Sequence, residues 1–139
     1  MKDGGAPVRW LNELEWVDGL IYANVYQTDC LAQVDPNNGG VVGWVQARGL
    51  RAAAEVAAAA DAAAAGGAGV EPTERPDVLN GVAWDAEGGR LFLTGKLWPR
   101  VYQVELRPLY RDSKRVSVPK LLAEVRAACI PAAGRAVGR

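Results

Sequence analysis

The sequence predicts an all-β fold in which one antiparallel unit occurs twice. Residues 20–35 (LIYANVYQTDCLAQVD) align without a gap against residues 90–105 (RLFLTGKLWPRVYQVE). A Leu-Asn pair precedes each of these windows, at residues 11–12 and 79–80. Internal repetition of this kind indicates a fold built from adjacent copies of one supersecondary unit.

The first copy predicts four short antiparallel strands. Residues 12–17 alternate in the manner of a strand, and Asp18-Gly19 is a strong signal for a two-residue hairpin turn. Four strands in about 36 residues is the size of one blade of a β-propeller. We therefore expect about two four-stranded antiparallel blades of a β-propeller in this chain. The other strands are expected at 20–25, 30–35 and 41–46, with turns at 27–29 and 36–40.

An alanine-rich tract separates the two copies. Residues 51–65 would be helical on propensity alone, because alanine is the best helix former. The tract has few large side chains that could be buried in a core. We interpret it as a surface insertion, helical or disordered, that ends at Gly66-Gly67.

The second copy is predicted to be incomplete. Its expected fourth strand falls in the stretch 107–120, which is charged and contains two prolines. Residues 119–128 could instead form a short amphipathic helix with Leu121, Leu122 and Val125 inward, and the residues from 131 onward look frayed. Three strands are expected at 78–85, 90–94 and 101–106, with a corner at 95–100. The predicted organisation is a blade unit at 11–46, an insertion and linker at 47–76, an incomplete blade unit at 77–107 and a tail at 108–139.

Two blades are too few to close a propeller ring. Each blade buries its faces against its neighbours, so a stable ring or solenoid usually needs at least three repeats. We therefore expect the chain to be a fragment of a larger gene product, or to self-associate through the open edges of its blades. Met1–Pro7 lacks the apolar stretch of a signal peptide, and we expect no transmembrane helix.

The composition argues against several classes of function. The 16 basic and 16 acidic residues cancel, so no basic field attracts nucleic acid or an anionic membrane. The chain has no histidine, which is the commonest general base and zinc ligand. Cys30 and Cys129 are far apart and lack CxxC spacing, so we expect neither a bridge between them nor a metal or cofactor.

A few polar residues stand out as candidates for a site. The repeat places Asn12 opposite Asn80 and Tyr26 opposite Lys96, so equivalent positions offer different side chains around one axis. Asn12 is followed by a strand without glycine, so we expect its side chain to point into a central funnel. Asn80 precedes a glycine and could equally cap a turn. Lys96, in a glycine-flanked corner, would be costly if buried and unpaired, and a surface lysine is the alternative. Tyr26 could also be a core aromatic.

A pair of glutamates in the first strand is the one carboxylate arrangement in the copies that resembles a catalytic pair. Glu13 and Glu15 flank Leu14 and share one face of the predicted strand. We interpret them as a solvated face or as polar contacts between blades.

The two copies resemble a known family. The stretches LNELEWVDGLIYANVYQTDCLAQVDP and VVGWV, then VLNGVAWD and RLFLTGKLWPRVYQVEL, are similar to the C-terminal part of plant and bacterial glutaminyl-peptide cyclotransferases. The resemblance covers residues 11–46 and 77–106. It implies a five-bladed β-propeller and a metal-independent reaction. In that reaction the α-amine of an N-terminal glutamine attacks its own side-chain carboxamide, and ammonia leaves as pyroglutamate forms.

The resemblance also implies roles for three residues of this sequence. Asn12 would hydrogen-bond the substrate, Tyr26 would wall the glutamine pocket, and Lys96 would supply a polar or cationic donor. Tyr26 stands where the family commonly has tryptophan. The acid–base glutamate of the family is expected on an earlier blade, so we assign no catalytic residue within this chain and expect it to be inactive alone.

The implied partner is a peptide or protein with an N-terminal glutamine. The resemblance suggests the secretory pathway, although nothing in the sequence itself fixes a compartment. The alternative is a non-catalytic propeller remnant that binds a partner protein or itself. A lectin-like module is disfavoured because Trp16, Trp44 and Trp84 lie inside predicted strands.

Overall fold

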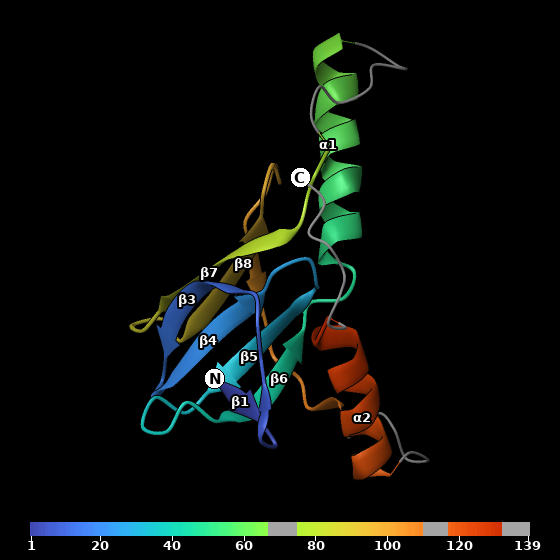
Figure 1. Cartoon of the computed structure of the whole chain (residues 1–139). Helices are drawn as coiled ribbons and strands as arrows, with labels where there is room; N and C mark the ends of the chain where they lie inside the picture. The colour runs from blue at the N-terminus through green and yellow to red at the C-terminus, as the bar shows by residue number, and fades with distance from the viewer. Residues whose placement is uncertain (67–74, 110–116, 132–139) are drawn as a thin grey trace.

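The computed structural model describes residues 1–66, 75–109 and 117–131, and it is mainly β, with antiparallel sheets and two helices (Figure 1). A short hairpin of β1 (Lys2–Asp3) and β2 (Ala6–Pro7) comes first. The four-stranded sheet has the order β3 (Leu11–Val17), β4 (Leu20–Val25), β5 (Cys30–Val34) and β6 (Val41–Gln46). The three-stranded sheet has the order β7 (Leu79–Asp85), β8 (Arg90–Gly95) and β9 (Tyr102–Val104). These positions confirm the strands predicted in both copies.

The two sheets share the same irregularities, as copies of one unit should. The pairing of β3 with β4 shifts register between Leu11 and Leu14, and the pairing of β7 with β8 shifts between Leu79 and Val82. A bulge of this kind bends the strand and redirects the side chains it carries. Each copy therefore begins with a bulged strand, and the bulges contain the Asn12 and Asn80 positions.

One face of the four-stranded sheet packs on one face of the three-stranded sheet. The shared core buries apolar side chains from both sheets, which excludes water from the space between them. Glu15 adds a polar contact across the gap, because its carboxylate accepts the Trp84 backbone N–H at 3.2 Å. This bears out the interpretation of Glu15 as a contact between the two units. The buried members of the core are Val17, Tyr22, Leu31, Ala47, Leu79, Val82, Leu91 and Leu93.

Part of the opposite face of the four-stranded sheet is exposed. Leu14 and Trp16 on β3 are 55% and 58% exposed. The equivalent residues of the second copy, Val82 and Trp84, pack into the core between the sheets. The first strand of the second copy is therefore covered on this face by the four-stranded sheet. On the first strand of the first copy, no described residue covers the equivalent side chains.

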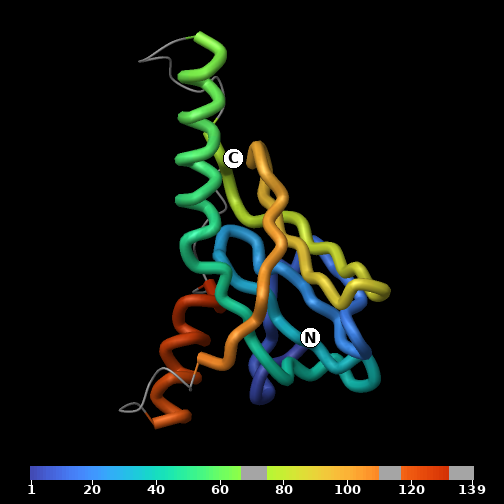
Figure 2. The backbone as a smooth tube through the Cα atoms, turned by 180° about the vertical axis from the view of Figure 1, so that it is seen from behind, coloured from blue at the N-terminus to red at the C-terminus, as the bar shows by residue number. Residues whose placement is uncertain are grey.

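Helix α1 (Leu50–Gly66) connects to the four-stranded sheet and stands beside the corner between β8 and β9 (Figures 1 and 2). Of the two alternatives expected for this tract, helical or disordered, the structure shows the helical one. Most of α1 is exposed, as expected for a surface insertion, but the helix contacts the rest of the protein at two places. Its first two turns contribute Leu50, which packs against the core, and the buried Ala54. Further along, Asp61 receives two hydrogen bonds from Arg100, at 2.7 and 2.8 Å.

Helix α2 (Val118–Cys129) packs against β5 and β6 and confirms the amphipathic helix predicted there. Val125 is buried as expected, and the other two predicted residues, Leu121 and Leu122, line the hollow between this helix and β6, where Leu122 stays 37% exposed. The expectation that the two cysteines stay apart is wrong. Cys30 and Cys129 form a disulfide because α2 brings its last residue, Cys129, against β5.

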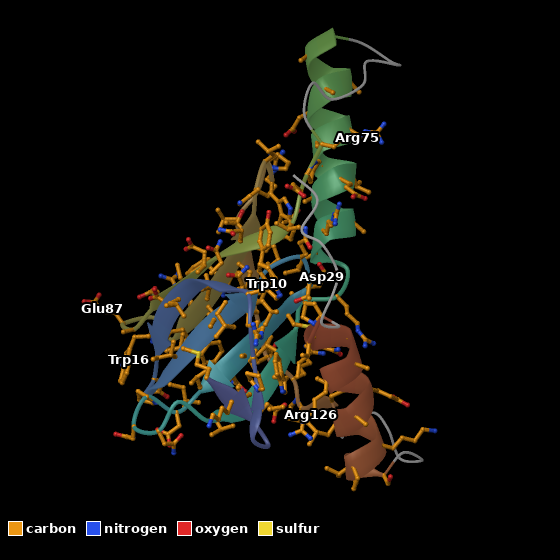
Figure 3. The ribbon with its side chains drawn as sticks, in the orientation of Figure 1. Trp10, Trp16, Asp29, Arg75, Glu87 and Arg126 are labelled. Carbon is orange, nitrogen blue, oxygen red and sulfur yellow. A yellow bond between two sulfur atoms is a disulfide. The ribbon has the colours of Figure 1, made fainter. Side chains whose placement is uncertain are left out.

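A partly buried ion pair between Asp3 and Arg126 joins the N-terminal hairpin to α2. Asp3 is 7% exposed, and its carboxylate accepts hydrogen bonds from Arg126 Nε at 2.6 Å and from Trp44 Nε1 at 3.1 Å. These hydrogen bonds, chiefly that of Arg126, hold the pKa of Asp3 below its usual range. The two hydrogen bonds thereby link the N-terminal hairpin to β6 and to α2, and Figure 3 shows Arg126 on the side of α2 that is nearer to the sheet. Of the two helices, neither is long and apolar enough to cross a membrane within the residues that the structure describes.

Candidate site at the strand corners

Two equivalent corners form the floor of the candidate site. Gln27 and Leu97, which follow Tyr26 and Lys96 in the chain, both adopt left-handed backbone conformations, with φ of 63° and 61°. The Tyr26 N–H donates to the Trp10 carbonyl at 2.8 Å, and the Lys96 N–H donates to the Val78 carbonyl at 3.0 Å. The corners thus have the same backbone design and present different side chains from the same position.

The Lys96 corner is held by a tryptophan. The Trp98 ring lies so close to Gly95 that a side chain at that position would collide with it. Trp98 Nε1–H also donates to the Asp77 carbonyl at 2.8 Å, and its ring makes an edge contact with Tyr102. Lys96 therefore extends from a backbone that is fixed on both sides.

Lys96 meets the other corner through its ammonium group. Its Nζ lies 5.1 Å from the centroid of the Tyr26 ring, which is within the range of a cation–π contact. The Lys96 side chain is exposed, so the cost of burying an unpaired lysine does not arise. Tyr26 is half-buried and lines the site, and it is not part of the core between the sheets.

The two bulge asparagines complete the contact between the copies. The Asn12 side-chain amide donates a hydrogen bond to the side-chain carbonyl of Asn80. Asn80, which the sequence left open as a turn cap, is therefore a partner of the predicted site residue. Gly81 allows this bulge, since a Cβ there would collide with the methyl group of Thr94.

Asn24 is a supporting residue that the sequence analysis did not single out. It is fully buried, its Oδ1 accepts the Glu13 N–H at 2.7 Å, and its Nδ2 donates to the Leu79 carbonyl at 2.8 Å. One side chain thus fixes both bulges, because Glu13 follows Asn12 and Leu79 precedes Asn80. The available signal was an asparagine inside a strand that is otherwise mainly apolar, LIYANV.

These elements enclose a pocket of about 200 Å³. The structure brings the three predicted residues together in it, and the sequence analysis missed two further lining residues that precede Asn12. The lining offers an amide and an ammonium group as hydrogen-bond donors beside an aromatic face, and it contains no carboxylate. The lining residues are Trp10, Leu11, Asn12, Tyr26 and Lys96.

The pocket's chemistry is that of a binding wall. Among the residues that line the pocket, Lys96 carries the formal charge, which is positive. The pocket therefore favours electron-rich groups such as a carbonyl oxygen. In the part of the chain that the structure describes, no group of three or more His, Cys, Asp or Glu side chains could hold a metal ion. A larger hollow of about 410 Å³ lies between β6 and α2, but its lining is mainly apolar, and its charged groups, Asp3 and Arg126, pair with each other.

Fold and site together define a class of protein: a repeated antiparallel β-sheet protein whose corners carry a small polar pocket. The model of the family described as glutamine cyclotransferase matches residues 1–106. The chain belongs to the glutamine cyclotransferase family.

Two relatives show how much of the family's length this chain represents. A glutaminyl-peptide cyclotransferase of Arabidopsis thaliana is 41% identical over 111 residues, which cover 77% of this chain and 29% of that protein. The crystal structure of Myxococcus xanthus glutaminyl cyclase matches with a TM-score of 0.55 and 39% identity, over 75% of this chain and 39% of that one. The chain thus spans well under half of either relative.

Proposed function

We propose that this chain supplies one wall of the substrate pocket of a metal-independent glutaminyl-peptide cyclotransferase. Its two sheets would be two blades of a five-bladed β-propeller, with the remaining blades provided from outside these residues. The observation that carries the proposal is the convergence of Asn12, Tyr26 and Lys96 on one pocket. The substrate would be a peptide or protein with an N-terminal glutamine.

The reaction sets three requirements, and the lining of the pocket is suited to two of them. The glutamine must be held folded so that its amine approaches its carboxamide carbon, and the aromatic face of Tyr26 suits this purpose. The oxygen of that carboxamide gains negative charge as the C–N bond forms, and the donors Asn12 and Lys96 are suited to stabilise it.

The third requirement is proton transfer. A proton must leave the attacking amine and reach the nitrogen that departs as ammonia, which calls for a carboxyl-type acid–base group. No carboxylate lines the pocket, and Glu15 is engaged by the Trp84 N–H. We therefore propose that the acid–base carboxylate comes from another blade and that the chain alone has no turnover.

The test is ammonia release from a glutaminyl peptide. It compares the chain alone with the chain joined to N-terminal blades of a family member, and a Lys96→Met variant of the joined protein serves as the matched control. We expect turnover in the joined protein, a strong loss in the variant, and none in the chain alone. A folded joined protein that forms no pyroglutamate would overturn the proposal.

The disulfide supports a location for this function. Cys30 and Cys129 form a bridge, and such bridges persist mainly in oxidising compartments. We propose that the protein works in the secretory pathway or outside the cell.

A second candidate function is self-association of a non-catalytic propeller remnant. The exposed Leu14 and Trp16 favour it, because the second copy shows their equivalents covered by a neighbouring sheet. Analytical ultracentrifugation of the wild type and a Trp16→Glu variant tests this candidate. A concentration-dependent oligomer that the variant lacks supports it, whereas a wild type that stays monomeric at every concentration rules it out.

A further inference from the structure

Trp10 is the one large aromatic residue of the pocket lining that the proposed function does not use. It directly precedes β3, lines the pocket and is 49% exposed. Figure 3 places it at the end of the four-stranded sheet nearest to α1. A half-exposed indole at the edge of a pocket offers an apolar face and an N–H donor, which suits it to contact a bound ligand.

The backbone of Trp10 supports a role for its side chain. Trp10 has a φ of 65°, a left-handed conformation that is unfavourable for a bulky residue. Its carbonyl accepts the Tyr26 N–H, but the equivalent bond in the second copy is accepted by Val78, which is not among the described residues with positive φ. The hydrogen bond alone therefore does not require this conformation. The conformation instead sets the direction in which the indole leaves the chain.

The size of the pocket defines what Trp10 could contact. About 200 Å³ is less than the volume of ordinary small-molecule sites, so the pocket accommodates a single terminal residue of a peptide. The following residue must lie at the mouth. An exposed apolar residue, Leu97, follows Lys96 in the chain and is 55% exposed. Both polar donors of the pocket thus have apolar side chains close by in the chain, Trp10 and Leu11 before Asn12 and Leu97 after Lys96.

We propose that Trp10 is a specificity-determining residue that packs against the second side chain of the peptide. It favours a large aromatic or aliphatic residue directly after the N-terminal glutamine. This proposal rests on the proposed function and deepens it by naming the class of substrate. Asn12 and Lys96 recognise the glutamine, and Trp10 discriminates among the peptides that carry one.

The experiment measures dissociation constants of short peptides for the chain itself, by NMR titration. The peptides begin with glutamine and differ only in the second residue, which is phenylalanine, leucine, alanine or glutamate. We expect the phenylalanine peptide to bind about tenfold more tightly than the alanine peptide, as burial of part of an aromatic ring predicts. In Trp10→Ala this preference falls to near unity, and Trp10→Phe restores part of it.

Trp16→Ala is the matched control. Trp16 is also exposed and lies on β3, the strand that Trp10 precedes. It does not line the pocket, so its replacement leaves the preference for the second residue unchanged. A preference that survives in Trp10→Ala overturns the proposal and leaves the proposed function standing, as does an equal weakening of all four peptides. A wild-type chain that binds none of the peptides overturns the proposed function, and this proposal with it.

Discussion

Replacing Asn24 by alanine should destabilise the fold far more than its small size suggests. The side chain is fully buried and makes two hydrogen bonds, at 2.7 Å to the Glu13 N–H and at 2.8 Å to the Leu79 carbonyl. Asn24→Ala leaves the buried Leu79 carbonyl and the part-buried Glu13 N–H without this partner, and a buried group left unsatisfied costs about 1–3 kcal/mol. We expect the free energy of unfolding to fall by about 3 kcal/mol.

The second copy offers a matched control for this substitution. Thr94 occupies the position equivalent to Asn24, is only partly buried, and makes one hydrogen bond, at 3.0 Å to the Arg100 carbonyl. Thr94→Ala should cost only about 1 kcal/mol. Urea unfolding followed by tryptophan fluorescence measures both values. Equal losses in the two variants would refute the idea that Asn24 joins the copies.

Three further predictions concern the tail, the ion pair and the pocket. Replacing Cys30 and Cys129 by serine should lower the free energy of unfolding by about 4 kcal/mol, because the bridge closes a loop of sequence separation 99; an unchanged urea midpoint would contradict this. The depressed pKa of Asp3 means that its pairing with Arg126 stabilises the fold above pH of about 4 and that this contribution is lost as pH falls through the folded pKa. The stability difference between wild type and Asp3→Asn should therefore shrink on acidification from pH 7, and a constant difference would refute the assignment. Lys96→Met should weaken binding of glutaminyl peptides at an unchanged urea midpoint, whereas equal loss of binding and stability would indicate a structural role.

Much of the fold could be predicted because its signals are local. The Asp18-Gly19 turn has φ of 48° and 89° and joins strands whose alternation is visible in the sequence. The alanine tract forms α1 because its propensity is high over many residues. The bulges are less visible, since their sequence signal, an asparagine after leucine, also fits a turn.

The contacts that the sequence did not reveal are those between distant segments. The Cys30–Cys129 bridge depends on α2 reaching β5, which no spacing rule indicates across a separation of 99 residues. The exposure of Trp16 depends on which face of its sheet is covered. Alternation indicates that a strand has two faces, but it does not identify which of them has a neighbour.

The candidate site was predictable in part, because the sequence shows the repeat and the resemblance directly. Asn12, Tyr26 and Lys96 were named from a resemblance and from their equivalent places in the repeat, and the structure places them around one pocket. Their roles remain a prediction. Trp10 was missed because its contribution comes from a left-handed backbone, and nothing in its neighbours' identity predicts that conformation.

The most direct test of the central claim is an NMR titration of the isotope-labelled chain with a glutaminyl peptide. The account predicts that resonance changes concentrate on the side chains of Asn12, Tyr26 and Lys96, and that a peptide with N-terminal alanine causes none of them. Changes confined to the hollow between β6 and α2, or no changes at saturating peptide, would contradict the claim that this chain carries a wall of the glutamine pocket.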